Sequence, residues 1–124
     1  MEIIVDVKPI TSYYSNGNKR RESWFLNGNL HRVDGPAIIH YYKSGKVEQE
    51  EYFLNDNYHR VDGPAIIFYY KSGNIAEEYW YIVDKRLMDN KCIEYKEWLI
   101  ANNLYKPYNT WTDEERVLWR LSWM

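Results

Sequence analysis

Two histidine and aspartate pairs at the same spacing are the residues of this sequence best suited to chemistry. His31 is followed by Asp34, and His59 by Asp62, each within the run His-Arg-Val-Asp-Gly-Pro-Ala. An imidazole beside a carboxylate can act as an acid/base pair or supply half of a metal site. Catalysis needs one asymmetric constellation, whereas a motif that recurs at fixed spacing serves a need common to both copies. We therefore interpret the motif as structural and expect no catalytic residue and no metal site.

This structural interpretation follows from what each residue type does in a loop. Asp accepts hydrogen bonds from nearby backbone amides, Gly permits an unusual backbone angle, and Pro fixes the backbone before the next strand. His40 does not recur, because Phe68 stands in its place, and we expect a packed histidine rather than a ligand. The predicted structural residues are His31, Arg32, Asp34, Gly35, Pro36, His59, Arg60, Asp62, Gly63 and Pro64.

The motif belongs to a longer repeat with a period of 28 residues. Residues 24–47 and 52–75 are identical at 18 of 24 aligned positions, so the repeat is not a chance match. Weaker copies at 13–17 and 80–82 flank them, as the ends of a stacked array require. Within each unit, β-forming residues cluster between short turn-forming runs, and short connections join antiparallel neighbours. The sequence therefore predicts one meander sheet.

Alternation along these strands predicts apolar side chains on both faces of the sheet, so at least one face must be covered. The expected cover is the C-terminal third, where the period stops and two helices are predicted. The first begins with Asp89 or Asn90 as its cap and runs to about Asn103, and the second follows a capping box at 112–115. We expect the aliphatic stripe of the second helix to pack on the sheet, leaving two tryptophans as exposed anchors. The stripe is Val117, Leu118, Leu121 and Met124, and the tryptophans are Trp119 and Trp123.

Acidic and aromatic residues of the predicted sheet form a candidate binding surface. Glu22, Glu50 and Glu78 recur at the 28-residue period and would form an acidic row. Such a row is either a solvated face or a patch complementary to a basic partner. Tyrosines on a sheet can likewise grip a partner or form cross-strand ladders. The candidate partner-binding residues are Glu50, Glu51, Glu77, Glu78, Tyr41, Tyr69, Trp119 and Trp123.

Composition argues against several classes of function. The chain has 16 basic and 18 acidic residues and a net charge of -2, which argues against binding nucleic acid or anionic membranes by bulk charge. Cys92 is the single cysteine, so no intrachain disulfide can form. No apolar run is long enough to span a membrane, and residues 1–10 carry charges where a signal peptide needs an apolar core. We expect a single cytoplasmic domain of 124 residues without a cofactor.

The repeated residues resemble a known family. Trp-Phe-Leu-Asn-Gly at 24–28, His-Arg-Val-Asp-Gly-Pro-Ala at 31–37, and Tyr-Tyr at 41–42 followed by Gly45 are similar to MORN-type repeats. The likeness is to their divergent His-Arg-x-Asp-Gly-Pro-Ala version, which is found in viruses, phages, bacterial mobile elements and repeat-type antitoxins. It covers about residues 10–86 and implies a β-hairpin array used for binding, with no assigned chemistry.

We therefore expect a β-rich α+β fold, an antiparallel β-meander of tandem MORN-like hairpins over 10–86 with two short helices in 87–124. The expected function, partly implied by the resemblance, is a noncatalytic protein-binding inhibitor from a phage, virus or mobile element. It would occlude a host or cognate effector, as an antitoxin or a counter-defence protein of the anti-CRISPR kind. The alternative is a protein that sequesters a nucleotide or small ligand through tyrosine stacking and Arg32, Arg60 or Arg86. The expected partner is a protein with a basic surface, such as a nucleic-acid-handling effector, and the chain is a monomer or an edge-paired homodimer.

Overall fold

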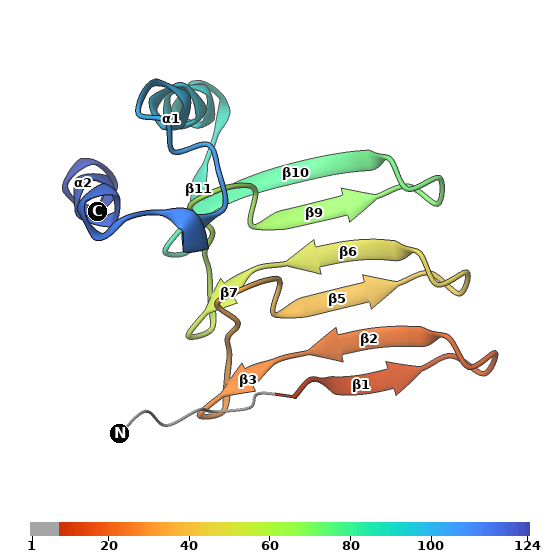
Figure 1. Cartoon of the computed structure of the whole chain (residues 1–124). Helices are drawn as coiled ribbons and strands as arrows, with labels where there is room; N and C mark the ends of the chain where they lie inside the picture. The colour runs from red at the N-terminus through yellow and green to blue at the C-terminus, as the bar shows by residue number, and fades with distance from the viewer. Residues whose placement is uncertain (1–7) are drawn as a thin grey trace.

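In the computed structural model, which describes residues 8–124, the main element is one seven-stranded antiparallel sheet (Figure 1). The strand order is β1-β2-β5-β6-β9-β10-β11, so long strands that follow one another in the chain are neighbours, as in a meander. Two helices follow the sheet, and the fold class predicted from the sequence is confirmed. Residues 1–7, which entered the signal-peptide argument, lie outside the described residues.

Each repeat unit builds one long and one short hairpin. The long hairpins pair β1 (Ile10–Tyr13) with β2 (Lys19–Ser23), β5 (Ile38–Tyr41) with β6 (Val47–Glu51), and β9 (Ile66–Tyr69) with β10 (Ile75–Ile82). The short hairpins pair β3 (Phe25–Leu26) with β4 (Asn29–Leu30), and β7 (Phe53–Leu54) with β8 (Asn57–Tyr58). In the third unit the end of β10 pairs with β11 (Lys85–Leu87). The short hairpins follow one another along one end of the sheet (Figure 1).

Two-residue turns close the short hairpins. Both central residues have positive φ at 27–28, 55–56 and 83–84, the pattern of type I′ turns. The first two turns consist of Asn, Asp and Gly, which tolerate this backbone well. The third places Val83 at φ 44°, where a β-branched side chain is strained. Val83 therefore adopts a conformation that the neighbouring structure imposes on it.

The helical segment begins after β11. Helix α1 spans Asp89–Ala101, a 3₁₀ helix spans Tyr108–Thr110, and α2 spans Asp113–Trp123. The capping box of α2 is confirmed, because the Thr112 hydroxyl accepts from the Glu115 amide and the Glu115 carboxylate accepts from the Thr112 amide at 2.8 Å. The predicted cap of α1 is wrong: Met88 occupies the cap position and no side chain caps the helix.

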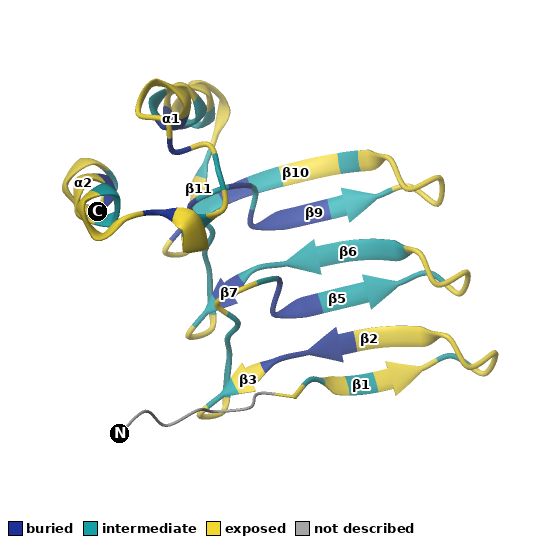
Figure 2. Ribbon diagram, in the orientation of Figure 1, coloured by how far each residue is buried: buried dark blue, intermediate teal, exposed yellow. Residues whose placement is uncertain are grey.

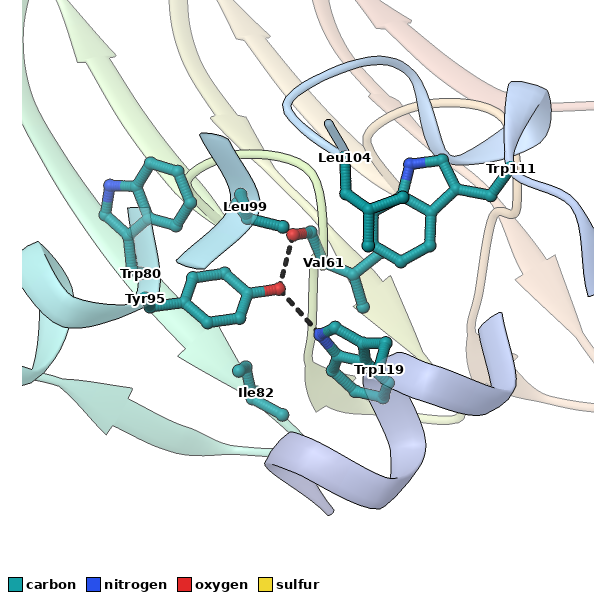
Figure 3. Packing of buried hydrophobic residues seen from close by; sticks show 8 residues of the cluster. All are labelled: Val61, Trp80, Ile82, Tyr95, Leu99, Leu104, Trp111 and Trp119. Atoms are coloured by element: carbon teal, nitrogen blue, oxygen red, sulfur yellow. Dashed lines mark hydrogen bonds between the residues drawn. The ribbon is translucent and has the colours of Figure 1, made fainter. Parts of the chain in front are cut away.

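The largest buried cluster forms where residues 88–124, here called the C-terminal segment, pack on the last two repeat units (Figure 3). Tyr95 is fully buried, and its hydroxyl donates to the Val61 carbonyl and accepts from the Trp119 indole nitrogen at 2.8 Å. Burial raises the pKa of Tyr95, so the phenol stays protonated as a donor. The cluster consists of Val61, Trp80, Ile82, Tyr95, Leu99, Leu104, Trp111 and Trp119. Its position confirms that the C-terminal third covers one end of the sheet.

The expected orientation of α2 is wrong. Trp119 is buried, and Trp123 is half-buried with its ring 4.6 Å from that of Tyr95. The aliphatic stripe that was expected to pack, Val117, Leu118, Leu121 and Met124, is exposed. A buried indole removes more apolar surface from water than a leucine, and the Trp119 N–H finds its partner in the Tyr95 hydroxyl. Within residues 8–124, no helix has both the length and the apolar character to cross a membrane.

Candidate binding site

The arginine of each repeated motif holds its own loop together. The guanidinium of Arg60 lies 4.0 Å from the ring centroid of Tyr52, where a cation–π contact forms. Its Nε donates to Asp62 at 2.9 Å and its Nη1 donates to the Pro64 carbonyl at 3.1 Å. In the first copy, Arg32 makes the equivalent contacts, with its guanidinium 3.9 Å from the Trp24 ring. The two motif loops, residues 31–37 and 59–65, are therefore built alike.

The glycine of the motif makes room for that arginine. A Cβ at Gly35 would lie 2.9 Å from the guanidinium carbon of Arg32, and a Cβ at Gly63 would lie 2.7 Å from that of Arg60. Neither glycine has a positive φ. The prediction that these glycines supply an unusual backbone angle is therefore wrong, because their role is to permit close approach.

The motif histidines connect each unit to the next. Nδ1 of His31 accepts from the Asn55 amide at 3.1 Å, and Nδ1 of His59 accepts from the Val83 amide at 2.9 Å. An Nδ1 that accepts a hydrogen bond belongs to a neutral ring, and burial lowers the pKa of His59. These contacts account for the histidines in structural terms. Within residues 8–124, no group of three His, Cys, Asp or Glu side chains is placed to hold a metal ion.

The predicted acidic row is interrupted by isoleucine. Strand pairing places Glu22, Ile39, Glu50, Ile67 and Glu78 side by side on successive strands, so the carboxylates are two strands, or roughly 10 Å, apart. A continuous row of neighbouring charges is therefore not formed, and repulsion between the carboxylates is weaker than the sequence pattern suggested.

Most of the predicted acidic side chains accept a hydrogen bond from a tyrosine hydroxyl. Tyr41 donates to Glu22, and Tyr69 donates to Glu50, in each case diagonally across a strand pair. Burial and the Glu50 carboxylate both raise the pKa of Tyr69. Three of the candidate partner-binding residues, Tyr41, Tyr69 and Glu50, are thus half-buried and joined to sheet partners.

The remaining acidic candidates differ in exposure. Glu51 is half-buried, accepts from the Tyr58 hydroxyl at 3.2 Å and lies 3.9 Å from His40 Nε2. Burial, with Glu51 beside it, raises the pKa of Tyr58 to about 12. Glu77 accepts from the Tyr79 hydroxyl, and both Glu77 and Glu78 are exposed. Of the eight predicted partner-binding residues, only these two glutamates are exposed.

A cleft of about 710 Å³ lies between the motif loops and the C-terminal segment. It is lined by residues 31–35 of the first motif loop, by Tyr52 and residues 59–62, and by residues 105–109 and the end of α2. Its charged side chains are mostly paired: Arg32 with Asp34, Arg60 with Asp62, and Lys106 with Glu115. Sequence reasoning missed the cleft because its far side belongs to a segment outside the repeat.

The outer side of α2 borders this cleft. Met124 and Arg120 line the cleft, and Leu121, between them in the sequence, is exposed. Most of the outward surface of α2 is exposed in Figure 2. The apolar pattern itself was visible in the sequence, but the side that packs was not. The candidate site is therefore the cleft together with the outer side of α2.

Comparisons of the chain with family models, with curated proteins and with solved structures each found no match. The function has to be argued from the geometry and chemistry of the candidate site.

Proposed function

We propose that this protein is a noncatalytic binding protein that docks a protein partner on the outer side of α2 and inhibits it by occlusion. The observation that carries the proposal is the exposure of the aliphatic stripe, 48% at Val117, 43% at Leu118, 82% at Leu121 and 72% at Met124. At 3.6 residues per turn, positions 117, 121 and 124 lie opposite Trp119, which faces the core. A clustered apolar helix face left in water favours a partner that covers it.

The absence of catalysis in this proposal is supported by how the motif side chains are used. The imidazole Nδ1 atoms accept backbone amides, and the arginines are stacked on aromatic rings and bonded within their loops. Asp62 accepts from Arg60 and from the Tyr108 amide. A nucleophile, a base and an oxyanion site arranged around a common point do not occur among these contacts.

The kind of partner is proposed from charge and from the resemblance of the repeats. Glu77 and Glu78 are exposed, and a partner with a basic surface would be steered toward them. The resemblance of 10–86 to MORN-type repeats of phages, viruses and antitoxins supports an effector that handles nucleic acid as the partner, met in the host cytoplasm. The protein would act as an antitoxin or a counter-defence inhibitor.

Introduction of negative charge on the apolar stripe of α2 tests this proposal. The tagged full chain, the double variant Leu121→Glu/Met124→Glu and the control Ile75→Glu are compared by capture from a host extract, followed by measurement of affinity with the purified captured protein. Ile75 is also exposed but lies in the sheet hairpin, far along the chain from α2. We expect at least tenfold weaker binding for the double variant, unchanged binding for the control and unchanged thermal melting for both.

Two results would contradict the proposal. One is the same set of captured proteins, with equal affinity, for all three chains. The other is a change of oligomeric state, measured by light scattering, in which the double variant converts a dimer to a monomer. That outcome would show that the stripe is covered by a second copy of this chain.

The cleft favours sequestration of a small ligand as a second candidate function. Its volume lies within the range of small-molecule sites, and the exposed Tyr105 is available for stacking. Titration calorimetry with AMP tests this candidate, which predicts a saturable signal that is lost in Arg32→Ala.

A further inference from the structure

The two motif loops share a sequence and an internal geometry but differ in what covers them. The arginine to ring distances are 3.9 Å and 4.0 Å, and the arginine to proline carbonyl distances are both 3.1 Å. Val61 in the second loop is 6% exposed, whereas Val33 in the first is 77% exposed. The side chain of Asp62 is 17% exposed and that of Asp34 is 78% exposed. The surface that is covered on the second motif loop is therefore exposed to solvent on the first.

The structure shows what covers the second loop. An aromatic turn, residues 105–111, lies against it, and the Tyr108 amide donates to the Asp62 carboxylate at 2.8 Å. The Trp111 ring belongs to the same buried cluster as Val61. The covered site therefore offers two kinds of contact. Its carboxylate accepts a hydrogen bond from a backbone amide, and its valine lies in an apolar cluster with an indole ring.

The cleft has the position that a second such turn would require. It is bounded by residues 31–35 of the first loop and by the turn already docked on the second loop. Successive units of the sheet are related by two strands, so an occupant of the first loop would lie beside the existing turn.

We infer that the first motif loop is a docking site for an aromatic turn of a partner protein. The turn donates a backbone amide to Asp34 and packs an aromatic ring on Val33, as Tyr108 and Trp111 do on the second loop. This inference rests on the proposed function, since it places a segment of the same protein partner in the cleft next to α2.

The partner is a different protein rather than a second copy of this chain. In each copy the turn is already bound to Asp62, and its release would expose the buried Trp111, Leu104 and Trp119. A phosphate-bearing ligand is disfavoured, because the exposed Asp34 carboxylate lines the cleft and is already paired with Arg32.

The test uses a peptide with the sequence of residues 105–112 as the probe. It is titrated into the ¹⁵N-labelled full chain, and amide shifts are followed by NMR. We expect saturable shifts at 31–35 and none at 59–63, where the site is occupied. Asp34→Ala and Val33→Arg should each weaken peptide binding at least tenfold, whereas the control Glu97→Ala, exposed on α1 and outside the cleft, should bind as wild type.

Three outcomes would overturn the inference: no saturable shift at 31–35, equal binding by Asp34→Ala and wild type, or shifts at 31–35 with AMP but not with the peptide. The last would assign the cleft to a small ligand. Partner capture that is lost in Leu121→Glu/Met124→Glu but kept in Asp34→Ala and Val33→Arg would also overturn it, and would leave the proposed function standing.

Discussion

Replacement of Asp62 by alanine should destabilise the fold far more than replacement of Asp34, although both residues occupy the same position of the repeat. The Asp62 carboxylate accepts from Arg60 Nε at 2.9 Å and from the Tyr108 amide at 2.8 Å, with 17% of its side chain exposed. The Asp34 carboxylate lies 3.2 Å from Arg32 Nε, with 78% of its side chain exposed.

The magnitudes follow from these surroundings. A hydrogen bond to a charged group contributes about 1.5–3 kcal/mol, and Asp62→Ala removes two while leaving the Arg60 guanidinium without its carboxylate. Allowing for water that enters the gap, we expect a loss of roughly 2–4 kcal/mol. An exposed ion pair contributes about 0–1 kcal/mol, so Asp34→Ala should cost less than about 1 kcal/mol.

Urea unfolding followed by tryptophan fluorescence measures both losses, because Trp111 and Trp119 lie in the cluster that the Asp62 contact supports. Asp62→Asn, which keeps one carbonyl oxygen as an acceptor, should give an intermediate loss. Equal destabilisation by Asp34→Ala and Asp62→Ala would refute the reasoning, since it would mean that the Tyr108 contact contributes nothing. A loss below about 1 kcal/mol for Asp62→Ala would refute it as well.

Other predictions concern a turn, a histidine and α2. Val83→Asn should raise the free energy of unfolding by about 1 kcal/mol, because it relieves strain at φ 44°, and Asn55→Val should lower it by a similar amount. No gain in stability for Val83→Asn, measured by calorimetry, would contradict this prediction. Burial lowers the pKa of His59, so the unfolded chain takes up a proton at a higher pH than the folded chain. The free energy of unfolding should therefore fall as the pH drops below about 6.5. A His59 titration midpoint at or above that value, measured by NMR, would exclude this pH dependence. In thermal melts, Trp119→Ala should cost about 3–5 kcal/mol and Leu121→Ala at most about 0.5, and equal costs would show that α2 packs on both sides.

The sheet could be predicted because its determinants are local and repeated. A type I′ turn at 55–56, a long hairpin a few residues later and the same spacing in the next unit leave one simple way to pair the strands. The capping box at Thr112 is local in the same sense. The turns and the cap depend on residues close in sequence, and the strand pairing follows from their regular repetition.

The errors concern the paths and partners of side chains, which neither turn chemistry nor strand spacing specifies. The packed side of α2 depends on Tyr95, whose hydroxyl accepts from Trp119 across 24 residues. The role of Gly35 depends on the path of the Arg32 side chain, which no turn rule describes. The Tyr69 to Glu50 contact depends on the register between β6 and β9.

The cleft could not be predicted for a related reason. Val33 and Val61 stand in identical heptapeptides, so their sequences cannot say which one the C-terminal segment covers. The choice is made by connectivity, because the segment leaves the sheet from β11, at the end nearer the second loop.

The amide to histidine contacts between units have an evolutionary consequence. Each one spans 24 residues and joins a unit only to its immediate successor, so no contact of this kind depends on how many units the array contains. Duplication or deletion of one 28-residue unit would change the width of the sheet by two strands, roughly 10 Å, while preserving every junction. The distance between the β1 edge and α2 can therefore be adjusted in fixed steps by recombination between the repeated segments, independently of mutations in the helical end.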